Sequence, residues 1–391
     1  MLRIRDATPG ARKWPAMTFR WPRTVATAFS ILFVIYAAWS VVVNTNDPPG
    51  IDFVSFWAAG RMASEGAPAA AYDIQLHRLL ELSVGKLGGL QPFPYPPPFL
   101  LFVVPFGMIP FAAGFAAWVA ATATLYFIAF RRIAPWPYTF AHPANFSNAL
   151  VGQNGMLTSA IFAGGFTLLD RRPWLAGALF GLLVVKPQLA VLIPVALLAG
   201  RYWRAIVAAA ATAAALLALA WLAFGEDTYR AFLANASHQA TLVSGRIPWP
   251  KIASAFGALR TMGVPVVPAL IVHGTIAIAA AGVTWLAWRR NWPTRLPIVA
   301  AASLLVSPYL LGHDSVLMMV PIGWLIVHQR RPAIVVLLWA ISILAVAAVG
   351  PNPTPVAAIL AIFVMWQEAR RLRSQSHEVA ESRPGLQSAV Q

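Results

Sequence analysis

Long apolar runs, bounded by short clusters of Arg and Lys, constrain the fold of this chain more than any other feature of its sequence. Of the 391 residues, 59% are hydrophobic and 11% are charged, whereas about a quarter are charged in an ordinary soluble domain. This composition excludes a soluble fold. The formal net charge of +16 does not indicate a nucleic-acid partner, because the basic clusters punctuate the apolar runs, as they do where they set membrane topology.

The apolar runs also predict an orientation. Residues 1–23 form a basic segment, and residues 24–43 follow without a charge. This run is too long for the apolar region of a signal peptide, so we interpret it as a first membrane crossing with its basic end in the cytoplasm. The following runs predict an all-α, polytopic integral membrane protein with roughly 10–13 transmembrane helices, several of them broken or short. Both termini are expected in the cytoplasm.

A single transmembrane domain is expected at residues 24–367. Its two polar outer loops are predicted at 44–96 and 225–264, and a charged, disordered cytoplasmic tail is predicted at 368–391. The expected location is the inner membrane of a bacterium.

Prolines and polar residues interrupt several of the apolar runs. The run at 94–110 is expected to dip into the membrane without crossing it, and 133–151 to form a weak span in spite of its three prolines. The segments 173–200 and 296–328 each predict two short helices that enter the membrane and return, with Lys186 at the outer turn of the first.

The chain contains no Cys, which excludes thiolate metal ligands and a thiol nucleophile. It also carries no phosphate-binding loop, no HExxH and no dinucleotide-binding fingerprint. Any chemistry must therefore come from the polar residues of the predicted outer face, where ionisable groups at membrane depth are costly and are candidates for function.

Asp52 is the first of these candidates. The aromatic-rich run that follows it, residues 53–62, is expected to lie in the membrane interface and to hold the carboxylate at a constant depth. A carboxylate in this place can act as a general base on a hydroxyl group. The alternative is a helix N-cap without a chemical role. Asp47, which precedes two prolines, is interpreted as a turn residue.

Lys186 is the only charged residue between Arg172 and Arg201, and Pro187 breaks the helix beside it. We predict that it binds a phosphate, since an isolated cation at a helix break suits an anionic leaving group. The alternative is that its side chain extends to the lipid head groups.

The other polar candidates each have a structural alternative. His313 and Asp314 form either a functional hydrogen-bonded pair or a turn with a neutral, structural His. Gln153 and Asn154, which glycines flank, bind sugar hydroxyls or cap the next helix. Tyr95 stacks on a sugar or belongs to the aromatic belt.

Three more cations belong to the predicted outer segments. Arg61 is a candidate for contact with a phosphate. Arg246 and Lys251 are either further phosphate ligands or solvated loop residues near anionic head groups.

Five segments resemble, in their order and spacing, glycosyltransferase family 87, the polyprenyl-phosphate-mannose-dependent α-mannosyltransferase-like proteins of the GT-C superfamily. They are DFVSFWAAGRMASEGAPAAAYD, YPPPFLL, GQNG, GLLVVKPQL and SPYLLGHD. The resemblance extends from about residue 50 to about residue 325. It implies a polytopic helical fold and the transfer of a sugar from an outward-facing polyprenyl-phosphate donor. The GT-C pattern of a catalytic Asp in the first outer loop carries over to Asp52.

Together, the residues and the resemblance imply an inverting hexosyltransferase that acts on mannose, with Asp52 as the base and a glycan or glycolipid as the acceptor. The expected donor-phosphate ligands are Lys186, Arg61, His313 and Arg246. The expected sugar or acceptor ligands are Gln153, Asn154, Tyr95 and Asp314. No metal or other cofactor is expected, because mannosyl members of the superfamily generally work without one and no second acidic cluster stands beside Asp52.

The alternative function is a multi-pass transporter or flippase of a lipid-linked or polar substrate, which also uses broken helices. A transporter concentrates its polar groups near the middle of the membrane. Here the apolar spans are clean and polar residues gather in the outer loops, which favours the transferase.

Overall fold

The computed structural model describes residues 49–85, 91–245, 249–348 and 350–381. Within these ranges the chain is helical, and one isolated bridge, between Ile252 and Leu311, is the only pairing of extended backbone. The prediction of an all-α membrane protein is confirmed. The basic segment 1–23 and the first predicted crossing at 24–43 lie outside the described residues.

Three of the described helices are long and apolar enough to cross a membrane. They are α5 (Phe111–Phe130), α14 (Val266–Arg289) and the part of α12 (Trp203–Gly245) that ends at Asn235. The remaining elements, in chain order, are α2 (Phe53–Ser64), η1 (Pro68–Tyr72), α3 (Ile74–Leu82), η2 (Pro97–Phe99), α4 (Leu100–Gly107), α6 (Trp136–Phe140), α7 (Pro143–Val151), α8 (Gly155–Leu168), α9 (Pro173–Leu182), η3 (Leu183–Val185), α10 (Pro187–Ala190), α11 (Leu192–Gly200), η4 (Trp249–Lys251), α13 (Ala255–Thr261), α15 (Arg295–Ser303), η5 (Gly312–Met318), α16 (Met319–Val327), α17 (Pro332–Ala347) and α18 (Thr354–Glu381).

The two segments that were expected to enter and return are broken as predicted. Residues 173–200 form α9, α10 and α11, and the break falls at Lys186, whose backbone is not helical (φ −145°, ψ 68°). Residues 296–328 form α15, η5 and α16. The weak span expected at 133–151 is wrong, because its prolines divide it into the short helices α6 and α7.

Two predicted irregular regions prove to contain helix. The expected outer loop at 225–264 begins as a continuation of α12, which kinks at Gly225 (φ 77°, ψ 169°) and then continues to Gly245. Glycine takes this positive φ without steric cost, so the helix resumes on the far side of the kink. The disordered tail expected from residue 368 is corrected as far as Glu381, because α18 extends to that residue.

The aromatic run after Asp52 lies in the core rather than in the membrane interface. Phe53, Phe56 and Trp57 of α2 are buried, and the Phe56 ring lies 5.5 Å from the ring of Trp118 on α5. The expectation of an interfacial helix at 53–62 is therefore wrong. This run has no continuous polar face, and a helix that is apolar all round packs inside the protein.

Helix α3 has the opposite polarity. Its polar residues His77 and Glu81 are buried, while Leu76, Leu79 and Leu82 are exposed along one face. Glu81 accepts hydrogen bonds from the backbone of Gln91, and the His77 ring lies 3.3 Å from the Ser55 hydroxyl. A helix with apolar residues outward and polar residues inward suits a lipid surface better than water.

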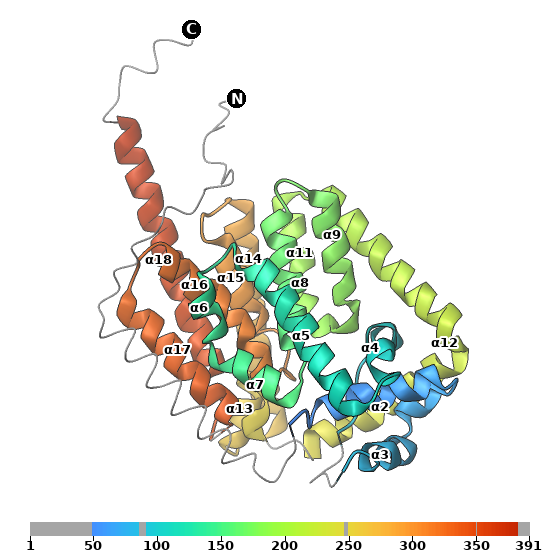
Figure 1. The fold of residues 1–391 in the computed structure, drawn as a ribbon. Coiled ribbons are helices and arrows are strands. Elements are labelled where there is room, and N and C mark those ends of the chain that lie inside the picture. Colours follow the sequence, from blue (N-terminus) through green and yellow to red (C-terminus); the bar gives the residue numbers. More distant parts are fainter. Residues whose placement is uncertain (1–48, 86–90, 246–248, 349, 382–391) are drawn as a thin grey trace.

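The helices define two ends of the molecule (Figure 1). Helices α2, α3, α7 and α13 lie at one end, which we call the α2 end, and the last turns of α18 project from the other. Arg289 and Arg290 close α14, and Arg171 and Arg172 follow α8. Since α8 begins at the α2 end, where Gly155 contacts Asn148 of α7, we call the other end the arginine end.

Candidate active site

Six polar side chains from five separate stretches of the chain form one connected set at the α2 end. We call this set the polar network. Its members are Asp52, Tyr95, Gln153, Asn154, Lys186 and Asp314. The sequence predicted all six as site residues, and the structure brings them together.

Asp52 precedes the first turn of α2, in the N-cap position, but its side chain makes no cap hydrogen bond. Its Oδ2 instead accepts a hydrogen bond of 3.0 Å from Nε2 of Gln153. The backbone N–H of Asp52 donates to the carbonyl of Val151 at 3.0 Å. The carboxylate is therefore turned toward the GQNG segment, so capping does not account for its orientation.

Lys186 and Asp314 form a buried ion pair. Lys186 Nζ lies 2.5 Å from Asp314 Oδ1, and the two side chains are 3% and 2% exposed. Nζ also donates to Asn154 Oδ1 at 2.9 Å, and Asp314 Oδ2 accepts from the backbone N–H of Leu311 at 3.2 Å. Lys186 thus does not extend to the head groups, and its charge is already balanced by Asp314.

Two polar atoms beside this ion pair have no hydrogen bond of ordinary geometry within the described part of the chain. They are Asn154 Nδ2 and His313 Nε2, and neither atom is accessible to solvent. The Asn154 amide is oriented by Lys186, which donates to its oxygen, and the Asn154 side chain also interacts with the Tyr95 phenol. Asn154 Nδ2 is a donor, and His313 Nε2 is a donor in the tautomer that carries its proton there. A buried donor without an acceptor costs about 1–3 kcal/mol, so a ligand oxygen would be stabilised beside these atoms.

The Tyr95 ring is packed in the aromatic core. Its centroid lies 4.5 Å from that of Phe99 and 5.3 Å from that of Phe56. Burial, and next the charge of Asp314, raise the pKa of the Tyr95 phenol, so the hydroxyl stays protonated and donates to Gln153 Oε1 at 3.5 Å. The prediction that Tyr95 stacks on a sugar is corrected, because its ring faces are covered.

The remaining predicted ligands stand apart from the network. Arg61 forms an ion pair of 2.5 Å with Glu65, more than two helical turns along α2 from Asp52. Arg246 lies outside the described residues. Lys251 is exposed on η4, and its charge acts on the His313 ring.

Asn148 is a site residue that sequence reasoning missed. Its Nδ2 donates to the backbone oxygen of His313 at 2.9 Å, and its Oδ1 accepts from the backbone N–H of Gly155 at 2.7 Å. It thereby fastens α7, the start of α8 and η5 to one another. No distinct signal in the sequence marks it, because the same short helix also contains Asn145 and Ser147.

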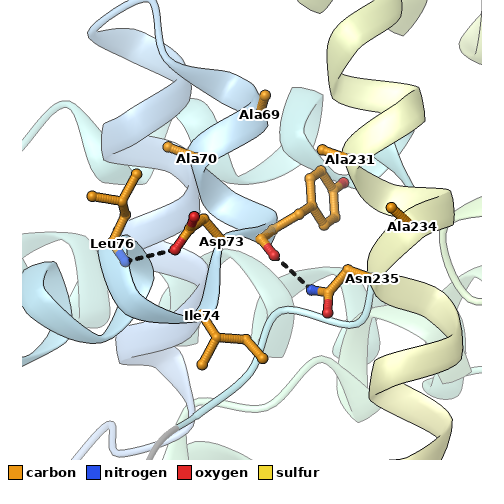
Figure 2. A pocket seen from close by; sticks show the side chains of 9 residues that line it. Ala69, Ala70, Asp73, Ile74, Leu76, Ala231, Ala234 and Asn235 are labelled. Atoms are coloured by element: carbon orange, nitrogen blue, oxygen red, sulfur yellow. Dashed lines mark hydrogen bonds between the residues drawn. The ribbon is translucent and has the colours of Figure 1, made fainter.

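A groove of about 540 Å³ lies between η1–α3 and the second half of α12. Alanines from both elements line it, and Asn235 of α12 donates to the backbone oxygen of Tyr72 at 2.7 Å (Figure 2). The Tyr72 hydroxyl donates to the backbone oxygen of Tyr95 at 3.0 Å. The groove therefore adjoins the polar network through a single pair of tyrosines.

Within the described residues, no group of three His, Asp or Glu side chains is placed so that it could hold a metal ion. Residues 93–308 match the family model of glycosyltransferase family 87. The match covers more than half of the chain and includes Tyr95, Gln153, Asn154 and Lys186. His313 and Asp314 lie just beyond its end, whereas Asp52 lies well before residue 93, where it begins. No curated protein and no solved structure matches the chain.

Proposed function

Because the chain belongs to glycosyltransferase family 87, we propose that it transfers a hexose from a polyprenyl-phosphate donor to a glycan or glycolipid acceptor. Family membership makes the protein a membrane glycosyltransferase. One observation supports the finer proposal. The polar network holds a half-buried carboxylate next to buried, unpartnered groups that suit a phosphate oxygen.

Asp52 acts as the general base in this proposal. It accepts the proton of the acceptor hydroxyl while the hydroxyl oxygen bonds to the anomeric carbon of the donor. The bond from that carbon to the phosphate oxygen breaks on the opposite face, and polyprenyl phosphate leaves with the electron pair. A single displacement inverts the anomeric carbon, so a β-linked donor gives an α-linked product. The hexose of the proposal is mannose.

Asn154 and His313 hold the departing phosphate. Asn154 Nδ2 and His313 Nε2 are two of the buried side-chain atoms that lack a hydrogen-bond partner within the described residues, and hydrogen bonds to a developing oxyanion stabilise the transition state. Lys186 contributes differently from a direct ligand. It fixes the Asn154 amide through Oδ1 and adds positive charge, while Asp314 keeps the lysine from being an isolated buried cation.

The α2 end faces outward in this proposal. Arginines gather at the opposite end, and basic clusters mark the cytoplasmic side of a membrane protein. A lipid-linked donor then meets Asp52 at the outer surface. The exposed leucine face of α3 lies at the same end, where it would rest in the outer leaflet.

The groove beside α3 is the proposed place for the prenyl chain next to the donor phosphate. Its volume lies within the range of ordinary ligand sites, and alanines form much of its walls. Ala231→Trp would fill it. We expect this variant to raise the apparent donor constant for a long-chain donor and to leave a donor with a truncated chain unaffected. Equal effects on both donors would show that the groove does not bind the prenyl chain.

The proposed function is tested with purified protein in lipid vesicles. The expected result is release of polyprenyl phosphate from polyprenyl-phosphate-mannose only when an acceptor is present, with an α-linked product. Glucose- and galactose-linked donors serve as comparisons for the sugar. Movement of the intact donor across the bilayer without release would favour a flippase instead.

A further inference from the structure

We infer that Gln153 is a positioning residue, whose side-chain amide fixes the direction of the Asp52 carboxylate and favours its ionised form. The inference rests on the proposed role of Asp52 as a base. It replaces the earlier expectation that Gln153 binds a sugar hydroxyl.

The orientation of the Gln153 amide follows from its partners. Oε1 accepts from the backbone N–H of Asn154 at 3.2 Å and from the Tyr95 hydroxyl at 3.5 Å. A backbone N–H can only donate, so the amide oxygen must lie on that side. The NH₂ group is therefore directed at Asp52 Oδ2, 3.0 Å away. Gln153 is 8% exposed, so water seldom replaces this contact.

The backbone around Gln153 is held firmly as well. Gly152 N–H and Gln153 N–H both donate to the carbonyl of Asn148, at 2.8 and 3.0 Å, and Trp118 Nε1 donates to the Gly152 carbonyl at 3.0 Å. Gly152 has a φ of 75°, and a Cβ atom there would lie 2.4 Å from the Cβ of Phe53. Only glycine permits this close approach of the turn to the start of α2.

The same turn also holds the backbone of Asp52. Gly50 N–H and Asp52 N–H donate to the carbonyls of Leu150 and Val151, at 2.9 and 3.0 Å. The backbone of Asp52 and the Gln153 amide are thus fixed to one rigid turn. The hydrogen bond between the two side chains joins groups that are already in place, so forming it costs little side-chain entropy.

A donor of this kind has a chemical consequence. A hydrogen bond to the charged form of a carboxylate stabilises that form, so Gln153 keeps Asp52 ready to accept a proton. A carboxylate in place of the amide would reverse the effect, because two carboxylates about 3 Å apart share one proton.

Two variants test the inference. Gln153→Glu should move the acid limb of the kcat/KM profile upward by at least about one pH unit and restore part of the rate at high pH. Gln153→Met removes the hydrogen-bond donor without adding charge, so it should lower kcat about 10- to 100-fold with little change in KM. The acid limb of its kcat/KM profile should move upward less than in Gln153→Glu. Gln329→Glu, the same change at an exposed residue of the arginine end, is the matched control.

A second measurement does not depend on glycosyl transfer. The pH dependence of carbodiimide labelling at Asp52, read by peptide mass spectrometry, reports how readily that carboxyl is protonated. The labelling midpoint should move upward in Gln153→Glu and less far in Gln153→Met, with exposed Asp73 unmoved in both. An unchanged midpoint at Asp52 in folded protein would overturn the inference. If the midpoint shifts but the wild-type protein transfers no sugar, the effect of Gln153 on the Asp52 carboxylate is supported and the proposed function is overturned.

Discussion

An ion-paired cluster around Asp170 at the arginine end and the Lys186–Asp314 pair at the α2 end use the same kinds of side chain in opposite ways. At the arginine end, Arg295 donates to both oxygens of Asp170 at 2.7 and 2.9 Å, and its guanidinium lies 4.6 Å from the centre of the Trp288 ring. Tyr202 donates to Asp170 at 2.5 Å. Asp170 is 63% exposed at its side chain, so water solvates this cluster in any arrangement.

At the α2 end, the Lys186–Asp314 pair is almost completely buried, and the donors beside it lack acceptors within the described residues. Water cannot substitute for a lost partner there, so the loss of one contact costs more stability than at an exposed ion pair. An exposed ion pair contributes about 0–1 kcal/mol. The comparison separates the solvated Asp170 cluster, which serves packing, from the buried Lys186–Asp314 pair, which lies among the candidate groups for chemistry.

The largest expected effect is at Asp52. Asp52→Asn keeps the shape of the side chain and removes its basicity, so transfer should fall by about two to four orders of magnitude. Membrane insertion and donor binding should be nearly unchanged. The exposed residue Asp227, changed in the same way, is the control. Near-normal transfer by a well-expressed Asp52→Asn protein would show that Asp52 is not the base.

The next effect concerns the buried ion pair. Lys186→Met leaves Asp314 charged and unpaired, which should lower the free energy of unfolding by about 3–5 kcal/mol, measured by denaturation in detergent. The double variant Lys186→Met/Asp314→Leu should regain much of that stability but not the transfer activity. Lys186→Arg should retain part of the activity. Full activity in the double variant would show that the ion pair contributes to stability and not to the reaction.

His313 should affect the reaction more than the fold. His313→Ala removes one proposed phosphate contact, and loss of a single oxyanion donor lowers kcat about 10²- to 10³-fold. The thermal midpoint should move little, because the backbone oxygen of His313, which Asn148 uses, remains. If instead stability falls and the kcat of the remaining folded protein is normal, His313 is structural.

The smallest effect is expected at the arginine end. Asp170→Asn should change the free energy of unfolding by less than about 1 kcal/mol and leave transfer within about twofold of the wild type. High salt should reduce even this difference, since salt screens exposed charges. A loss comparable to that of Lys186→Met would contradict the distinction between the two ends.

Local features of the sequence were sufficient for the fold class and for most of the network. Asp52 and Lys186 stand out because each is a charge beside an apolar run, and Pro187 marks the helix break at the lysine. The proposal of a phosphate ligand at Lys186 needed revision, since its partner Asp314 lies 128 residues further along the chain. No local pattern predicts which distant carboxylate a buried lysine will meet.

Other errors have equally specific causes. The aromatic run after Asp52 resembles an interfacial helix in composition, but its burial depends on packing against α4 and α5. Polar residues after Gly225 suggested a loop, whereas one glycine with a positive φ allows helix on both sides of a kink. Arg61 was grouped with the site because it belongs to a predicted outer segment. Its side chain instead pairs with Glu65, one helical turn further along α2.

The separation of Lys186 from Asp314 also bears on how the protein is made. A ribosome that adds about 5–20 residues per second needs roughly 6–26 s to synthesise the intervening stretch. During that interval the lysine has no counter-charge, and a lone ammonium group within a bilayer is costly. We expect the α9–α11 segment to remain in contact with water or with the insertion machinery during this interval. Synthesis of η5, which delivers Asp314, is the event that allows this segment to settle at its final depth.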